Sequence, residues 1–216
     1  MNFERLYAYR FRGIDQASRD AVWSEIAPFV WNAMGRPRRL LDPAAGRLEF
    51  MAFAPADERW AVDHVRYEAA VEVPGLRFIE GDARTIELPP AHFDGIWISN
   101  FLEHLDSQEA VAAFLERMHT VTAPGGRIAI MGPNIRYCAD EYWDCADHTV
   151  ALSHVAIAEH LYAAGFEPIR VEPRFLPYSF RGRLPASRRL TRTYLRLHLA
   201  WRFLGKQFLV VGERRA

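Results

Sequence analysis

Residues 38–49 read RRLLDPAAGRLE. The first half of this stretch is a short apolar run that ends at Asp42, and its second half is rich in Pro, Ala and Gly. A short continuous apolar run bounded by turn residues is typical of a strand that is covered on both faces. The stretch therefore predicts a buried strand over residues 38–42 that delivers an acidic side chain into a tight loop.

Similar apolar runs recur along the chain, separated by helical patterns. The further strands are expected at 59–63, 76–80, 93–98, 127–131, within 167–175 and at 207–211, and the helices at 18–34, 107–121 and 153–164. Ser18 and Ser107 are the expected N-caps, and Pro28 predicts a kink or break in the first helix. Because strands that alternate with helices favour parallel pairing through right-handed crossovers, we expect an α/β fold. It would have a seven-stranded, mostly parallel sheet with helices on both faces.

The composition is that of one ordinary globular domain over residues 1–216. Half of the residues are hydrophobic and a quarter are charged, which excludes disordered and fibrous classes. No apolar run approaches the length of a membrane-spanning helix, and the charged N-terminus lacks the apolar core of a secretion signal. With only two cysteines, no CxxC pair and no zinc-ligand spacing, we expect a cytoplasmic protein with reduced thiols and no metal site.

The net charge of zero hides an asymmetry. Residues 166–216 hold 12 of the 27 basic residues and three of the 27 acidic ones. Residues 176–205 form a basic insertion, in which we expect one helix that starts near Ser187. Its apolar face comprises Leu190, Tyr194, Leu197, Trp201 and Leu204. Three interpretations remain open: a lid helix on the sheet, recognition of an anionic acceptor, and shallow contact with a membrane surface that presents a lipid-linked acceptor. No motif for binding nucleic acid accompanies the charge, so we expect none as partner.

Polar side chains follow the predicted strands. Asp42, Asp63, Asp82 and Asn100 each stand at or just after the end of a strand. The carboxyl ends of parallel strands meet at one edge of a sheet, where such folds bind ligands. The sequence therefore predicts a polar rim at that edge, suited to a ligand rich in hydroxyls and amines.

The ordered set LLDPAAG, AVDH, FIEGDA, FDGIWISNFLEHL, APGGRIAIMGPN and LYAAGF resembles the class I S-adenosylmethionine-dependent methyltransferases. GPNIRYCADEYWDCADH and the basic tail resemble a narrower subgroup that accompanies polysaccharide or glycoconjugate assembly. The resemblance implies a Rossmann-like fold with residues 1–35 as an N-terminal helical cap. It also implies S-adenosylmethionine as cofactor and methyl transfer to a small molecule or glycan, which we expect at a hydroxyl.

The resemblance also implies roles for individual residues. The loop from Asp42 to Gly46 would pass under the methionine part of the cofactor, Asp63 would accept hydrogen bonds from the ribose, and Asp82 with the amide of Ala83 would read the adenine. Asn100 and Phe101, which follow the fourth strand, would lie beside the methyl donor. The implied cofactor residues are Asp42, Ala44, Gly46, Asp63, Asp82, Ala83, Asn100 and Phe101.

The glycine loop departs from the family pattern D-x-G-x-G-x-G. Ala44 and Leu48 replace the first and third glycines, and Pro43 removes a backbone donor. Two alternatives follow from these departures. One is a catalytically degenerate binding or scaffolding protein, and the other is an enzyme that uses the same pocket for a reaction other than methylation.

A hydroxyl acceptor needs a group that takes its proton, and His104 and His148 are the candidates for this catalytic role. Asp144 or Glu141 could orient His148. The loop after the fifth strand mixes aromatic and charged side chains that suit a sugar or another flat acceptor. Its candidate acceptor-binding residues are Asn134, Arg136, Tyr137, Tyr142 and Trp143.

Overall fold

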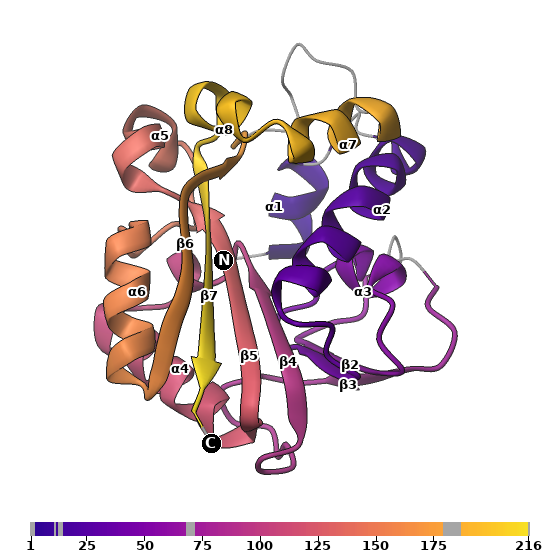
Figure 1. Ribbon diagram of the computed structural model, residues 1–216, viewed down its shortest axis with the longest axis vertical. Coiled ribbons are helices and arrows are strands. Elements are labelled where there is room, and N and C mark those ends of the chain that lie inside the picture. The colour runs from indigo at the N-terminus through magenta and orange to yellow at the C-terminus, as the bar shows by residue number, and fades with distance from the viewer. Residues whose placement is uncertain (1–2, 11, 13–14, 68–71, 179–186, 216) are drawn as a thin grey trace.

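The computed structural model describes residues 3–10, 12, 15–67, 72–178 and 187–215, which are built around one sheet (Figure 1). The strand order is β3-β2-β1-β4-β5-β7-β6, and only β7 runs antiparallel to its neighbours. The predicted α/β fold with a mostly parallel seven-stranded sheet is confirmed. The strands are β1 (Arg39–Asp42), β2 (Glu58–Asp63), β3 (Leu76–Glu80), β4 (Phe93–Ser99), β5 (Thr122–Pro133), β6 (Phe166–Leu176) and β7 (Gln207–Arg214).

Helices cover both faces of the sheet, on opposite sides in Figure 1. On one face, Trp97 of β4 and Ala129 of β5 pack in a core with α2 (Gln16–Ala33), α3 (Glu49–Phe53), α7 (Arg188–Arg196) and α8 (His198–Leu204). The alternate strand residues Ile96 and Ile128 face α4 (Gln108–Val121) and α6 (His154–Ala163). The continuous apolar runs thus reflect burial on both faces.

Two of the remaining short helices follow strand ends, and one precedes the first strand of the sheet. The 3₁₀ turn η1 (Leu102–His104) follows β4, α5 (Ile135–Tyr142) follows β5, and α1 (Phe3–Arg10) opens the chain. Ser107 caps α4 as predicted, and Ser153 caps α6. Asp15, not Ser18, caps α2, because its carboxylate accepts from the Ser18 amide at 2.9 Å. The helix continues through Pro28, whose turn lies among the buried residues Ile26, Ala27 and Val30.

The basic insertion lies at the carboxyl edge of the sheet. Leu176 at the end of β6 and Pro133 at the end of β5 both pair with Gln207, the first residue of β7. The prediction of one helix with a single apolar face was wrong. One helix ends before Leu197 and a second begins after it. Leu195 and Trp201 face the core, whereas Leu197 and Leu204 are exposed.

Candidate active site

The loop after β1 adopts a conformation that explains the family glycines. Gly46 has a φ of 50° and Leu48 a φ of 66°. A left-handed conformation costs an L-residue about 1–2 kcal/mol, whereas burying a leucine contributes about 1.5–3 kcal/mol. Leu48 is fully buried against Ala45 and Ala61, so its packing offsets the backbone cost. Ala44 is not among the described residues with positive φ, so this position does not need glycine.

The buried carboxylate of Asp42 and the half-buried carboxylate of Asp63 hold this loop. Asp42 accepts a hydrogen bond from the Ala44 amide at 3.2 Å, and Asp63 accepts one from the Gly46 amide at 2.7 Å. Burial, with a smaller contribution from the charge of Asp63, raises the pKa of Asp42 to about 8. Burial also raises the pKa of Asp63. Two nearby, poorly solvated carboxylates at one loop fit a ligand that brings hydroxyl and ammonium donors.

Asp82 lies just after the end of β3, and its carboxylate already has a partner within the protein. Its carboxylate forms an ion pair with Arg84 at 2.7 Å, which lowers the pKa of Asp82. The adjoining Gly81 amide donates to the Asp63 carbonyl at 2.8 Å, so Asp63 and Asp82 sit on adjacent, linked strand ends. Ala83 is buried. A ligand that hydrogen-bonds to Asp82 must therefore share this carboxylate with Arg84.

Asn100 and Phe101 diverge after β4. Asn100 is exposed at this edge with a φ of 48°, and its amide donates to the Met131 carbonyl at 2.9 Å. The Phe101 ring packs on Phe114 of α4, with ring centroids 5.1 Å apart. Asn100 is thus accessible to a ligand at the rim, while Phe101 packs on the hydrophobic core.

His104 has one hydrogen-bonded ring nitrogen, Nδ1, whereas Nε2 lies 4.0 Å from Glu103 Oε1. Its Nδ1 lies 2.9 Å from the Asp147 carbonyl oxygen and 3.4 Å from Asp147 Oδ2. Both oxygens accept, so in the neutral ring Nδ1 carries the proton and Nε2 bears the lone pair. Arg10 of α1 forms an ion pair with the same carboxylate, which lowers the pKa of Asp147. This arrangement leaves Nε2 of His104 as a proton acceptor.

Backbone contacts bring His148 to the same place. The Thr149 and Val150 amides donate to the Glu103 carbonyl at 2.9 and 3.2 Å, which fixes this loop on η1. The rings of His104 and His148 meet edge to face with centroids 4.9 Å apart. Burial, then the neighbouring His104, lowers the pKa of His148 to about 4, so its ring is neutral near pH 7.

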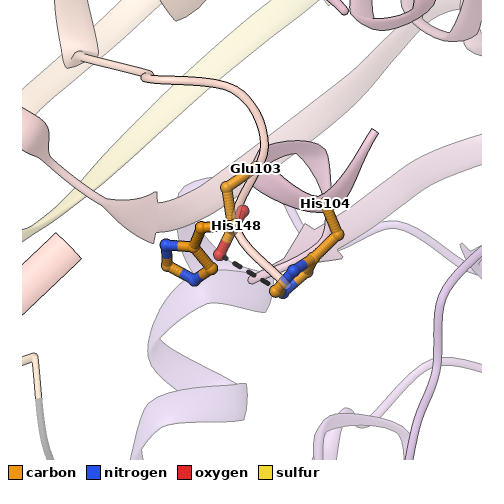
Figure 2. Close-up of side chains that lie close together, drawn as sticks. All are labelled: Glu103, His104 and His148. Carbon is orange, nitrogen blue, oxygen red and sulfur yellow. Dashed lines mark ion pairs between the residues drawn. The ribbon is translucent and has the colours of Figure 1, made fainter. Parts of the chain in front are cut away.

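Glu103 completes a cluster with the two histidines (Figure 2). One ligand atom from each of the three residues lies within 4.8 Å of the others, so the set has the donor types of a metal site. His104 Nε2 and Glu103 Oε1 are 4.0 Å apart, and burial raises the pKa of this carboxyl. Donors around a tetrahedral zinc ion stand about 3.3 Å apart, as follows from bonds of about 2 Å. The separation between His104 Nε2 and Glu103 Oε1 is thus wider than that between two donors on one zinc ion.

The candidate acceptor residues lie in three different environments. Asn134 is buried and donates to the Pro173 carbonyl at 2.8 Å, and Tyr137 is sandwiched between His154 and Arg174. Tyr142 is buried and donates to the Val150 carbonyl at 2.6 Å. These contacts join α5 and its N-cap to β6, to α6 and to the loop before α6. Exposed positions in this segment include Arg136 and Trp143.

Sequence reasoning missed Asp147 and Glu103. The suggested partners of His148 are placed elsewhere, since Glu141 pairs with Lys206 and Asp144 is exposed. Asp147 instead orients His104, which is 43 residues away in the chain. The signal was present in the dipeptides Glu103-His104 and Asp147-His148. Only the backbone bonds between the two loops show that these dipeptides meet.

Comparisons with known proteins agree with the observed fold. Residues 33–130 match the sequence model of a family described as "Methyltransferase domain". No match was found among curated proteins. A S-adenosylmethionine-dependent methyltransferase from Archaeoglobus fulgidus is 21% identical and has a TM-score of 0.68, with 98% of this chain and 100% of that chain covered.

Two further solved structures share the fold. The 1,6-didemethyltoxoflavin-N1-methyltransferase of Burkholderia thailandensis, with its substrate and S-adenosylhomocysteine bound, is 20% identical with a TM-score of 0.61, over 99% of this chain and 88% of that chain. The [4+2]-cyclase SpnF is 15% identical with a TM-score of 0.62, over 89% of this chain and 81% of that chain. The match over residues 33–130 and the shared fold support a class I methyltransferase domain that uses S-adenosylmethionine as its cofactor.

Proposed function

We propose that this protein transfers a methyl group to a hydroxyl of a small molecule or glycan. The observation that carries the proposal is the His104–Asp147 pair. Its hydrogen bond at 2.9 Å fixes the tautomer that leaves Nε2 ready to accept a proton. A hydroxyl, unlike an amine with a free lone pair, must lose its proton as it is methylated.

The cofactor residues at the carboxyl edge of the sheet would bind different parts of the cofactor. When bound, S-adenosylmethionine supplies an electrophilic methyl group. Asp42 and Asp63 would accept hydrogen bonds from its hydroxyl and ammonium donors, and Asp82 with Ala83 would hold the adenine. Asn100 would border the reacting groups at the end of β4. His104 would take the acceptor proton, while the neutral His148 beside it would help to exclude water.

The proposal is tested by incubating the full chain with S-adenosylmethionine and panels of hydroxylated acceptors, including sugars and lipid-linked glycans, and detecting methylated products by mass spectrometry. We expect products methylated at oxygen and turnover that depends on His104. Products methylated only at nitrogen or carbon would contradict the hydroxyl assignment.

One solved relative supports an alternative. SpnF shares the fold and is described as a [4+2]-cyclase. A rearranged product without methyl transfer, in the presence of bound cofactor, would favour an enzyme that uses the pocket for another reaction. Cofactor binding without any turnover would favour a scaffolding protein.

A further inference from the structure

Large apolar side chains gather on the surface of the basic insertion. The exposed fractions are 53% for Leu197, 60% for Leu199, 73% for Phe203 and 46% for Leu204. Leu199 and Phe203 are four residues apart on α8, so they lie on the same side of the helix. Exposed leucines and phenylalanines are ordinary when scattered, but an exposed apolar patch such as that of Leu199 and Phe203 marks a surface that meets a protein or a membrane.

Positive charge surrounds this apolar group. Arg189, Arg196 and Arg202 are exposed on α7 and α8. They form no ion pair among the residues that the structure describes, whereas Arg188 and Arg192 pair with Glu25 of α2. The sequence has no Asp or Glu from residue 173 to residue 212. An apolar helical ridge edged by arginines is typical of helices that lie in the interface of an anionic bilayer.

The exposed apolar residues belong to a segment that lies close to the candidate active site. α7 and α8 connect the carboxyl end of β6 to the first residue of β7, which pairs with the last residue of β5. They therefore lie at the edge of the sheet that carries the candidate active site (Figure 1). None of the described helices is long and apolar enough to cross a membrane.

We propose that the surface formed by Leu197, Leu199, Phe203 and Leu204 with Arg189, Arg196 and Arg202 docks on an anionic lipid bilayer. Docking would turn the carboxyl edge of the sheet toward the bilayer surface and bring a lipid-anchored acceptor near that edge. The binding step is independent of the acceptor hydroxyl, so it is measured without substrate.

The test is flotation of the full chain with vesicles of phosphatidylcholine alone or with about one-third phosphatidylglycerol. We expect binding to the anionic vesicles that falls with added salt. The double substitution Leu199→Ser/Phe203→Ser should reduce partitioning at least about tenfold, because two large side chains no longer enter the interface. Arg196→Gln/Arg202→Gln should weaken binding to anionic vesicles only. Tyr162→Ser is the matched control, since Tyr162 is 68% exposed on α6.

Intact folding of each variant is checked by thermal melting and by affinity for S-adenosylhomocysteine. The proposal is overturned if the wild-type chain does not float with anionic vesicles, or if Tyr162→Ser weakens binding as much as Leu199→Ser/Phe203→Ser. It is also overturned if the ridge mediates self-association and vesicles do not compete with it. If the wild-type chain binds vesicles but transfers no methyl group to any acceptor, only the proposed function is contradicted.

Discussion

His104 shows how hydrogen bonding selects the tautomer of a single side chain. Its Nδ1 is fixed by the carbonyl and carboxylate of Asp147, while its Nε2 lies 4.0 Å from Glu103 Oε1. His148 contributes a neutral ring beside it, because burial disfavours its protonation. The acceptor side of the site thus depends on two loops that are far apart in the sequence.

The first prediction concerns this pair. His104→Ala should lower kcat by about 10²–10⁴-fold with little change in cofactor affinity, because the general base is lost. Asp147→Asn should also lower kcat, since an amide no longer selects the tautomer. Steady-state kinetics with a defined acceptor measures both, with His198→Ala and Asp144→Asn as exposed controls. Unchanged turnover in His104→Ala would remove this residue from the mechanism.

Leu48 gives a second prediction at the same scale. Truncation of its buried side chain removes packing, but only glycine relieves the left-handed backbone at φ 66°. We therefore expect Leu48→Gly to be at least as stable as Leu48→Ala, with both below the wild type. At Leu115, within helix α4, glycine should instead be the worse replacement by about 1 kcal/mol. Denaturant unfolding measures the free energy of unfolding of the four variants. A Leu48→Gly variant that is less stable than Leu48→Ala would contradict the strain argument.

At the scale of elements, Glu25 joins two helices. Its carboxylate binds Arg188 and Arg192, and these bonds lower the pKa of Glu25 to about 2. Since the folded pKa is depressed, the stabilisation is present above the unfolded pKa near 4.5 and is lost as pH falls toward 2. The contact holds α7 against α2 at neutral pH.

We expect Glu25→Gln to increase hydrogen exchange in residues 188–196 at pH 7 while exchange in α4 stays unchanged. The exposed Glu116→Gln on α4 serves as control. The difference between Glu25→Gln and the wild type should shrink as the pH approaches 2. Equal protection of α7 in both proteins at pH 7 would show that apolar packing alone holds this helix.

The elements also show how far the sequence could be interpreted. Strands and capping serines such as Ser107 were predictable, because they depend on local apolar runs and on one side chain. The basic insertion was mispredicted, since its spacing is helical throughout while the break at Leu197 depends on which leucine reaches the core. The strand-end carboxylates could be named from the sequence. The role of Asp147 could not, because it depends on contacts with η1.

At the scale of the whole molecule, the buried Asp42 links stability to pH. Burial raises its folded pKa to about 8, well above the ordinary value. The unfolded chain therefore ionises first, and stability falls as pH rises from about 4 through 8. Asp42→Asn should flatten this decline in the absence of cofactor. Urea unfolding at pH 5, 6.5 and 8 tests this, with the exposed Asp57→Asn as control, and parallel curves for Asp42→Asn and wild type would contradict it.

Carboxylates at neighbouring strand ends would together form one site for S-adenosylmethionine. The most direct measurement is calorimetric titration of the full chain with S-adenosylhomocysteine, comparing wild type, Asp63→Ala and the surface control Asp57→Ala. We predict one-to-one binding that Asp63→Ala weakens by about 1–3 kcal/mol, because donors on the ligand lose their acceptor, and that Asp57→Ala leaves intact. Absence of binding to the wild type near millimolar concentration, or equal affinity in Asp63→Ala, would contradict the account.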